Sequence, residues 1–315
     1  AAGALVAKNV LNRSINLILL NVETEATIGL ALRKEAEKNN AIVTVADGDE
    51  PVAALDLYNF AQELSFDVIS IGKGKNNPFN TFATPSSLTK EASLKQMNPK
   101  MLTSFVDGTK TMVEMAALAN FLGFNIDIDG MHGIEATYEN INQFYIPKKD
   151  GGLLDESQVV DFAFGIAPGV FAVIYSEDDY VNYEMEYLKM GKGPYWTLAR
   201  PYHLTSLEIP RTIRHIMLEK YSKLSAQSWN VEVVAHAKQD IEPGTNLGSI
   251  GGDYIYGKAQ KTSSSKGLLP IGIAEDNVVT KAIAKGNPIA IDEVDAQDNE
   301  LCEYWDYQNQ ILDSD

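Results

Sequence analysis

The sequence predicts an α/β fold that opens on a parallel sheet, continues into a mixed α+β region and ends in a small all-β unit. Over the first 85 residues, short apolar runs typical of strands buried on both faces alternate with helical patterns. After residue 85, strand patterns follow one another through tight glycine-containing links, which is typical of antiparallel pairing. From residue 229 onward only short strands separated by Gly and Pro remain. The predicted domains are therefore residues 1–85, 86–228 and 229–315.

The first region is predicted to contain three parallel strands at residues 15–20, 41–46 and 66–71. Residues 26–38 carry helical apolar spacing between the first two strands, and Pro51 suits the first turn of the next helix. Strands and helices joined by short links form right-handed crossovers, so we expect one parallel sheet. This is about half of a Rossmann-type nucleotide-binding domain, that is, an incomplete Rossmann-type sheet.

The second region is predicted to combine an amphipathic helix with an antiparallel meander. The helix covers residues 107–121, and strands are expected at 170–175, 184–190 and 195–200. A further helix is expected from Ser206 onward, because serine is a favourable N-cap. The strands expected in the third region lie at residues 231–237, 254–259, 271–273 and 289–291.

Charge and composition exclude several classes of protein. The chain has 43 acidic and 26 basic residues, a net charge of −17, which repels nucleic acid and anionic membrane surfaces. The longest apolar runs, such as residues 17–20, are far shorter than the ~20 residues that span a bilayer. Cys302 has no second cysteine to pair with, as expected in a reducing compartment. We expect a cytoplasmic protein that binds neither nucleic acid nor membrane.

The most unusual segment is the sequence GKGKNNP at residues 72–78, directly after the third predicted strand. Open α/β sheets bind ligands at the carboxyl ends of their strands. Lys73 and Lys75 supply positive charge there, and Asn76 and Asn77 supply amide groups that donate hydrogen bonds. The segment predicts a site for a small anion. The alternative is a glycine-rich surface turn with solvated lysines.

A second group of polar residues lies on and before the predicted helix 107–121. Asp107, Lys110 and Glu114 are spaced i, i+3, i+7, so they would share one helix face, with Lys100 and Ser104 just upstream. An acid–lysine–acid arrangement can keep the lysine charged or prepare it for proton transfer. The alternative is a solvated face with weak salt bridges.

Two further groups could bind metal ions or anions. Asp47 and its acidic neighbours at 49–50 follow a strand, and Glu23 follows another, so a divalent metal could lie at this edge. Helix capping is the stronger interpretation at position 49. Arg200 and His203 could hold a carboxylate or phosphate, although a buried, hydrogen-bonded histidine is the stronger interpretation of His203 by itself.

Six segments, taken together, resemble a known family of oxidoreductases. They are residues 21–23, 47–51, 72–78, 97–110, 188–195 and 200–208. They resemble homoserine-dehydrogenase-like enzymes with a C-terminal SAF domain, a family that includes the deoxyxylulose-phosphate-reductoisomerase-like (DRL) enzymes of isoprenoid precursor synthesis. The resemblance covers essentially the whole chain.

The resemblance implies an NADP- or NAD-binding Rossmann domain, a central catalytic domain and a β-clip SAF domain, and by analogy a homodimer. It implies hydride transfer on a small anionic substrate, phosphorylated or carboxylated, with Lys110 donating the proton and Asp107 and Glu114 tuning it. Candidate substrate-binding residues are Lys73, Lys75, Asn76, Asn77, Lys100, Ser104, Arg200 and His203; candidate cofactor-binding residues are Asn21, Glu23 and Gly48; candidate metal ligands are Glu23 and Asp47.

The sequence also departs from this family. Homoserine dehydrogenases carry an Asp and a Lys four residues apart where this chain has Lys110 and Glu114, and an Asn-Lys pair where Asn21 precedes Val22. Homoserine is therefore not the expected substrate. The family's glycine-rich cofactor motif would precede Ala1, so the chain is expected to hold the later half of the Rossmann domain. The competing hypothesis is a non-catalytic ligand-binding or assembly protein that uses the SAF module.

Overall fold

A five-stranded mixed sheet forms the largest sheet of the structure, a computed structural model that describes residues 2–295 and 300–314. Its strand order is β4 (Ile134–Glu135), β5 (Val159–Phe164), β3 (Asp67–Gly74), β6 (Val170–Tyr175) and β7 (Tyr195–Arg200). The strand β3 pairs parallel with β5 and antiparallel with β6, and all of its residues after Asp67 are buried. The predicted strands at 170–175 and 195–200 are thus confirmed.

The prediction that three parallel strands share one sheet is wrong. The strands β1 (Leu17–Leu19) and β2 (Val43–Val45) pair parallel with each other, as predicted, in a separate two-stranded sheet. The third strand, β3, lies in the five-stranded sheet instead. Its apolar run indicates burial on both faces, which a central strand of a mixed sheet has as much as a strand of a parallel one. The domain boundaries stay predictions.

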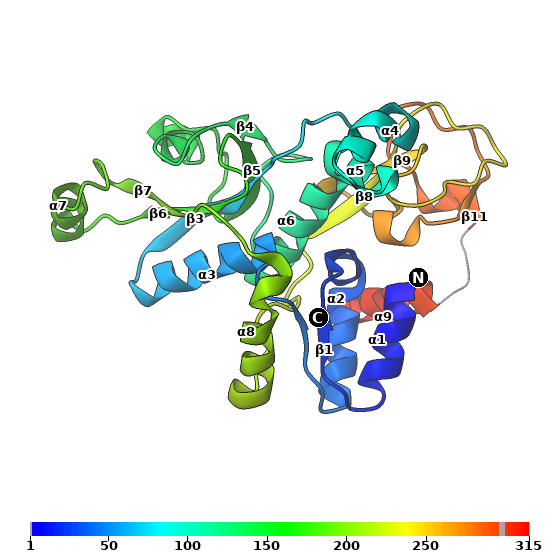
Figure 1. The fold of residues 1–315 in the computed structure, drawn as a ribbon, viewed down its shortest axis with the longest axis horizontal. Coiled ribbons are helices and arrows are strands. Elements are labelled where there is room, and N and C mark those ends of the chain that lie inside the picture. The colour runs from blue at the N-terminus through cyan, green and yellow to red at the C-terminus, as the bar shows by residue number, and fades with distance from the viewer. Residues whose placement is uncertain (1, 296–299, 315) are drawn as a thin grey trace.

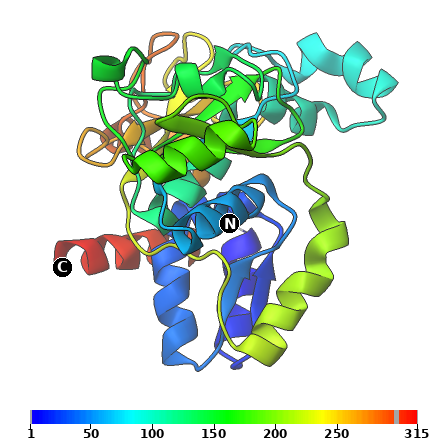
Figure 2. The same cartoon turned by 90° about the vertical axis from the view of Figure 1, so that its left-hand side faces the viewer.

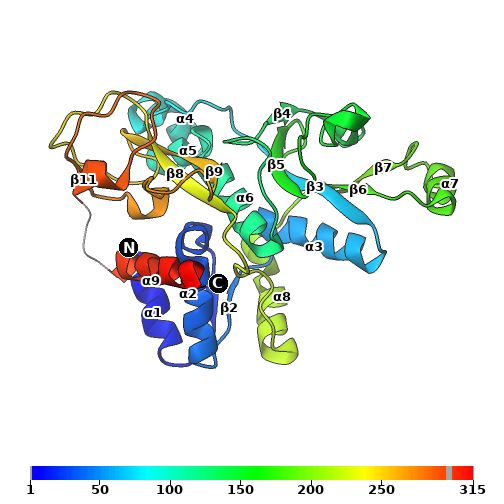
Figure 3. The same ribbon diagram turned by 180° about the vertical axis from the view of Figure 1, so that it is seen from behind.

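Three helices pack together beside β1 and β2: α1 (Ala2–Leu11), α2 (Val22–Lys38) and α9 (Glu300–Ser314) (Figures 1 and 3). The helix α2 is kinked at Ile28, whose backbone is not helical. Gln308 of α9 fills the kink: its Nε2 donates to Thr27 O and its Oε1 accepts from Leu30 N, both at 3.1 Å. A side chain far along the chain thereby satisfies two backbone groups that the kink exposes.

The helix α6 (Thr109–Leu122) lies between the three packed helices and the five-stranded sheet. It packs against α2, against α3 (Glu50–Glu63) and against β5, and most of its residues are buried. The helices α4 (Pro85–Leu94) and α5 (Pro99–Val106) precede it. None of the helices in the described residues combines the length and the apolar content that a membrane crossing needs.

The strand predicted at residues 184–190 is wrong, because this segment begins in α7 (Asp179–Tyr187). Asp178 caps the helix by accepting hydrogen bonds from the backbone N–H groups of Tyr180 and Val181. The helix lies at the tip of an arm formed by β6 and β7 (Figure 1). A second projection is α8 (Ile209–Arg214), which a 3-10 turn at Thr205–Glu208 precedes, so Ser206 is not its N-cap (Figure 2).

The C-terminal region is built on β8 (Val231–Ala237) and β9 (Ile255–Lys261), an antiparallel pair, with the short pair β10 (Val278–Val279) and β11 (Val294–Asp295). The predicted strand at 271–273 is a 3-10 turn, and 289–291 contributes only an isolated bridge at Ala290 before a second such turn. The region packs against α6, where Thr109 Oγ1 accepts from Gly257 N at 2.8 Å. Identification of this region as a SAF domain stays a prediction.

A buried carboxyl group on α2 gives a stability prediction. Burial raises the pKa of Glu25 from 4.5 to about 7, and its Oε1 accepts from Ala226 N at 2.6 Å. Because the folded-state pKa lies above the unfolded value, the free energy of unfolding falls as the pH rises from about 4.5 through 7, by on the order of 3 kcal/mol. Glu25→Gln keeps the acceptor and removes the titration, so its melting temperature should fall less between pH 5 and 8 than that of the wild type.

Thermal unfolding across this pH range measures the difference. Glu63→Gln is the control, because Glu63 is exposed on α3 and its substitution should leave the wild-type pH dependence intact. Parallel pH profiles for Glu25→Gln and the wild type would contradict the prediction.

Candidate active site

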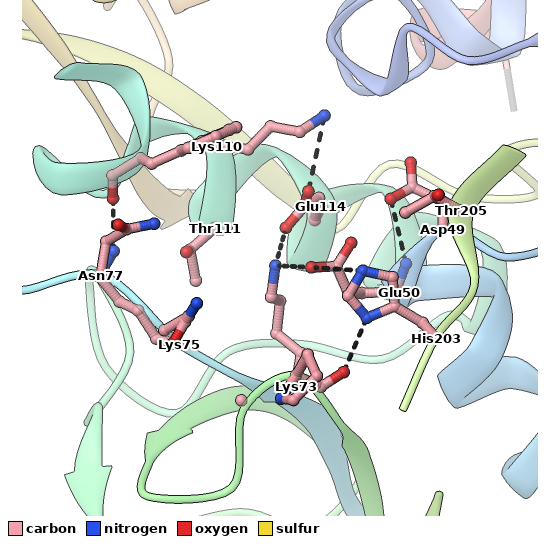
Figure 4. Close-up of a pocket in the computed structure, with 14 residues that line it drawn as sticks. Asp49, Glu50, Lys73, Lys75, Asn77, Lys110, Thr111, Glu114, His203 and Thr205 are labelled. Atoms are coloured by element: carbon pink, nitrogen blue, oxygen red, sulfur yellow. Dashed lines mark hydrogen bonds and ion pairs between the residues drawn. The ribbon is translucent and has the colours of Figure 1, made fainter. Parts of the chain in front are cut away.

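A pocket of about 330 Å³ opens where the carboxyl end of β3, the start of α3 and the first turns of α6 meet (Figure 4). The structure brings residues 73–77 of the predicted segment together with Lys110 and Glu114 here, although residues 72–74 belong to β3 and do not follow it as predicted. The lining residues are Asp49, Glu50, Lys73, Gly74, Lys75, Asn76, Asn77, Phe105, Lys110, Thr111, Glu114, Pro168, His203 and Thr205.

Lys73 lies at the centre of the charged groups. It is 5 % exposed, and its Nζ lies 2.7 Å from Glu50 Oε1 and in direct contact with Glu114 Oε2. Burial alone would lower the pKa of Lys73, but the two carboxylates outweigh it and raise the pKa above its usual range. Lys73 therefore stays protonated, and its charge is already balanced within the protein.

Lys110 extends from the first turn of α6 and is partly exposed. Its Nζ lies 3.5 Å from Glu114 Oε1 and 3.4 Å from Glu23 Oε1. Burial opposes its charge, yet these two carboxylates raise the pKa of Lys110 above its usual range. Acidic and basic side chains thus alternate along one chain of contacts, which we call the charge ladder: Glu50, Lys73, Glu114, Lys110 and Glu23, with the His203 ring beside Glu50 at one end.

His203 stands at one end of the charge ladder and borders the pocket. Its Nδ1 lies 2.7 Å from the backbone oxygen of Pro168. Because a carbonyl oxygen can only accept, Nδ1 carries a proton and donates it. The other ring nitrogen, Nε2, faces Glu50 Oε1 at 3.6 Å. The ring is thereby oriented by the backbone and directed at the carboxylate.

The three carboxyl groups of the pocket differ in their pKa values. Burial raises the pKa of Asp49 and that of Glu114, and their mutual proximity adds to it at Asp49. Burial also acts on Glu50, but Lys73 and a hydrogen bond with Asp49 together outweigh it and lower the pKa of Glu50. Asp49 also caps α3, as expected, because it accepts from Glu50 N at 3.1 Å. Negative charge is therefore concentrated on Glu50 beside Lys73.

These carboxylates could hold a metal ion by distance alone. Oxygen atoms of Asp49, Glu50 and Glu114 lie within 4.8 Å of one another, and no other such group of three occurs among residues 2–295 and 300–314. However, the ammonium group of Lys73 already contacts both glutamates. The residues fit a lysine-centred ion cluster better than a divalent cation, and we assign no step to a metal.

Several predicted site residues lie outside the pocket, Asp107 first among them. Gly108, with φ +90°, separates α5 from α6, so Asp107 ends α5 and does not share a helix face with Lys110 and Glu114. It is buried, and its Oδ2 lies 2.8 Å from Lys238 Nζ. The prediction that Asp107 shares one helix face with Lys110 and Glu114 is therefore wrong.

The other predicted residues outside the pocket have structural contacts. Arg200 pairs with Asp56 at 3.7 Å and contacts Glu208, and Asp47 accepts from Thr212 Oγ1 at 2.9 Å. Lys100 Nζ lies 3.3 Å from Ser249 Oγ, and Ser104 Oγ donates to Met101 O. Gly48 O accepts from Thr205 N at 2.9 Å, which holds the 203–205 segment against the pocket. The predicted metal ligands Asp47 and Glu23 have different partners, Thr212 and Lys110.

A second pocket, of about 220 Å³, adjoins the charge ladder through Glu23. It is lined by Gly3, Ala4, Asn21, Glu23, Thr24, Thr27, Ile250, Gly272, Glu275 and Leu301. Asn21 follows β1 and caps α2 by accepting from Thr24 N at 3.1 Å. Two of the predicted cofactor residues, Asn21 and Glu23, thus lie together, whereas Gly48 does not line this pocket.

Some lining residues of the first pocket carry no signal in the sequence. Thr111 is adjacent in sequence to Lys110, and helical spacing could have included it. Phe105, Pro168 and Thr205 come from three separate segments, and only the packing of those segments brings them to the pocket. Asp49 and Glu50 were visible as acidic residues after a strand, but capping explains that pattern equally well.

Ion-paired lysines that line a small pocket at the carboxyl end of a strand are typical of a binding site for a small polar molecule in an α/β fold. The family model for the catalytic domain of oxidoreductase DRL matches residues 48–209. Every residue that lines the first pocket lies in that range. The chain therefore belongs to the DRL oxidoreductase family. No curated protein matches it.

Proposed function

We propose that the protein is an NAD(P)-dependent oxidoreductase, homoserine-dehydrogenase-like and DRL-like, that acts on a small anionic hydroxy-carbonyl substrate. The observation that carries this proposal is the 3.4 Å ion pair between Lys110 and Glu23. Lys110 lines the first pocket and Glu23 lines the second, so one contact joins the two. A hydride transfer needs the substrate and the nicotinamide in adjoining sites.

The second pocket suits one end of the cofactor. Asn21, Thr24 and Thr27 offer amide and hydroxyl groups, and Glu23 offers a carboxylate, which together match the hydroxyls of a ribose and a carboxamide. Its lining within the described part of the chain contains acidic residues and no basic one, so it does not suit the pyrophosphate. When bound, NAD(P)H supplies the hydride.

Lys110 is the proposed catalytic residue. Its ammonium group would donate a hydrogen bond to the substrate carbonyl and then the proton that the nascent alkoxide takes up. The raised pKa of Lys110 keeps the proton in place before the reaction. An alkoxide is a much stronger base than an amine, so the transfer remains downhill. Glu114, 3.5 Å away, orients the lysine.

Cofactor binding and turnover test the function. The melting temperature of the full chain should rise with NADPH or NADH, because a ligand that binds only the folded state stabilises it. Oxidation of the cofactor should follow with at least one member of a panel of small hydroxy-carbonyl acids and phosphates. Absence of both responses would reject the proposal in favour of a non-catalytic ligand-binding or assembly protein. The homodimer also remains a proposal, and light scattering would test it.

A further inference from the structure

A third pocket, of about 570 Å³, lies between β8, the loop after β9 and α9. Glu232 of β8 lines it, together with Trp305 and Leu312 of α9. None of its described lining residues lines either of the first two pockets. All of them also follow residue 209, where the match to the oxidoreductase catalytic domain ends. The third pocket is therefore separate from the candidate active site, and the proposed function gives it no role.

The buried ionisable group of this pocket is the carboxyl group of Glu232, which is 6 % exposed. Its Oε2 accepts from Trp229 Nε1 and its Oε1 accepts from the backbone N–H of Val233, both at 3.0 Å. Within residues 2–295 and 300–314, no positively charged side chain forms an ion pair with it. The two hydrogen bonds fix the position of the carboxyl group, but no opposite charge balances it when it ionises.

Two indole rings and several aliphatic side chains line the same pocket. The hydrogen bond from Nε1 holds the ring of Trp229 beside the carboxyl group of Glu232. Trp305 reaches the pocket from α9 and is half-buried. Among aromatic rings, the indole face attracts a cation most strongly, and sites of this kind recognise quaternary ammonium groups. A carboxylate beside indole rings thus matches a cation that also carries alkyl groups.

We propose that the third pocket binds a small organic cation with an alkylated ammonium group. Glu232 supplies the opposite charge, and the indole rings of Trp229 and Trp305 contact the alkyl groups around the nitrogen. A metal ion is the poorer match, because the group of three candidate metal ligands found in the described residues lies in the first pocket. This inference goes beyond the proposed function and does not depend on it.

The ionisation of Glu232 makes this binding depend on pH. Burial raises the pKa of Glu232 to about 7, and its two hydrogen bonds oppose burial only in part. Two other charged residues line the pocket, Lys266 on the loop and Asp313 on α9, but both are exposed and they are opposite in sign. The cation pairs with the ionised carboxylate, so its affinity should rise about tenfold from pH 6 to pH 8, as the ionised fraction does for a pKa of about 7.

Two probes of the same shape test whether the positive charge is needed. Choline and 3,3-dimethylbutan-1-ol differ at one atom, a positively charged nitrogen in the first and a neutral carbon in the second. Ligand-observed NMR titration of the full chain at pH 8 should show choline binding at least about tenfold more tightly. Equal binding of the two probes, or no saturation by choline, would overturn the inference.

Variants locate the binding in the third pocket. Glu232→Gln keeps an oxygen that can accept from Trp229 but cannot ionise, so it should weaken choline binding at least about tenfold and abolish its pH dependence. Trp305→Leu should also weaken binding, because it removes one indole face. Glu242→Gln is the matched control, since Glu242 is an exposed acidic residue of the same region outside the pocket, and it should bind like the wild type. Unchanged binding in Glu232→Gln would overturn the inference, and if this variant does not fold, unchanged binding in Trp305→Leu would do so.

Discussion

Replacing Lys110 by methionine is expected to lower kcat by about 10²–10⁴-fold, the range for loss of a positioned proton donor. Methionine keeps much of the length of the side chain and removes its ammonium group. The fold should survive, because Glu114 keeps its contact with Lys73 and Glu23 is 31 % exposed and can be solvated. The free energy of unfolding should therefore fall by no more than about 1 kcal/mol. Steady-state kinetics and urea unfolding measure the two effects.

Lys90→Met on the exposed face of α4 is the control, with wild-type kcat expected. A kcat for Lys110→Met within threefold of the wild type would remove Lys110 from the reaction. If KM rose while kcat stayed the same, the lysine would be a binding group and not the proton donor.

Lys238→Met is expected to destabilise the protein by about 3–5 kcal/mol, because it leaves a buried carboxylate without its partner. Lys238 Nζ lies 2.8 Å from Asp107 Oδ2 and 2.8 Å from Gly252 O, and both side chains of the pair are at most 1 % exposed. The pair fastens the junction between α5 and α6 to the C-terminal region. The midpoint of urea unfolding should move to clearly lower concentration.

The matched control is Lys281→Met. Lys281 pairs with Asp292 at the same distance, 2.8 Å, but both side chains are more than half exposed, so solvent screens the pair and the loss of stability should be much smaller. Adding Asp107→Asn to Lys238→Met should recover part of the stability, since the uncompensated charge is then gone. Equal effects of Lys238→Met and Lys281→Met would contradict the prediction.

The sequence predicts the strands better than it predicts their partners. Apolar runs located β1, β2 and β3 and the pairing of the first two, because burial on both faces leaves a clear local pattern. The same pattern does not say which sheet a strand joins. The strand β3 lies in the larger sheet because it pairs with β5 and β6. Both strands are far from β3 along the chain, and a local sequence pattern does not predict pairing between distant segments.

The error at α7 has a local cause. Apolar residues at 185, 187, 188 and 190 nearly alternate with polar ones, which favours a strand. However, Tyr180, Tyr183 and Tyr187 are spaced i, i+3, i+7, and Asp178 precedes them as an N-cap. An N-cap residue followed by this spacing predicts a helix over these residues.

The candidate site was partly predictable for a similar reason. Lys73 lies near the end of β3 and Lys75 directly follows it, and Lys110 and Glu114 share a helix face, so local rules identify them. Local spacing misplaced Asp107, because the break at Gly108 interrupts the helix. Arg200 and Lys100 carry the positive charge that an anion site needs, but in the structure they contact Asp56 and Ser249, outside the pocket. Only tertiary packing decides between such partners.

The contact between Gln308 and the kink of α2 bears on the order in which the protein can mature. The groups it joins are 281 residues apart along the chain, so α2 emerges from the ribosome long before its partner is synthesised. Until then, water must satisfy Thr27 O and Leu30 N. The helix α2, which carries Glu23, also lacks the two hydrogen bonds from Gln308. The helices α2 and α9 can therefore pack against each other only after the catalytic region between them has been translated.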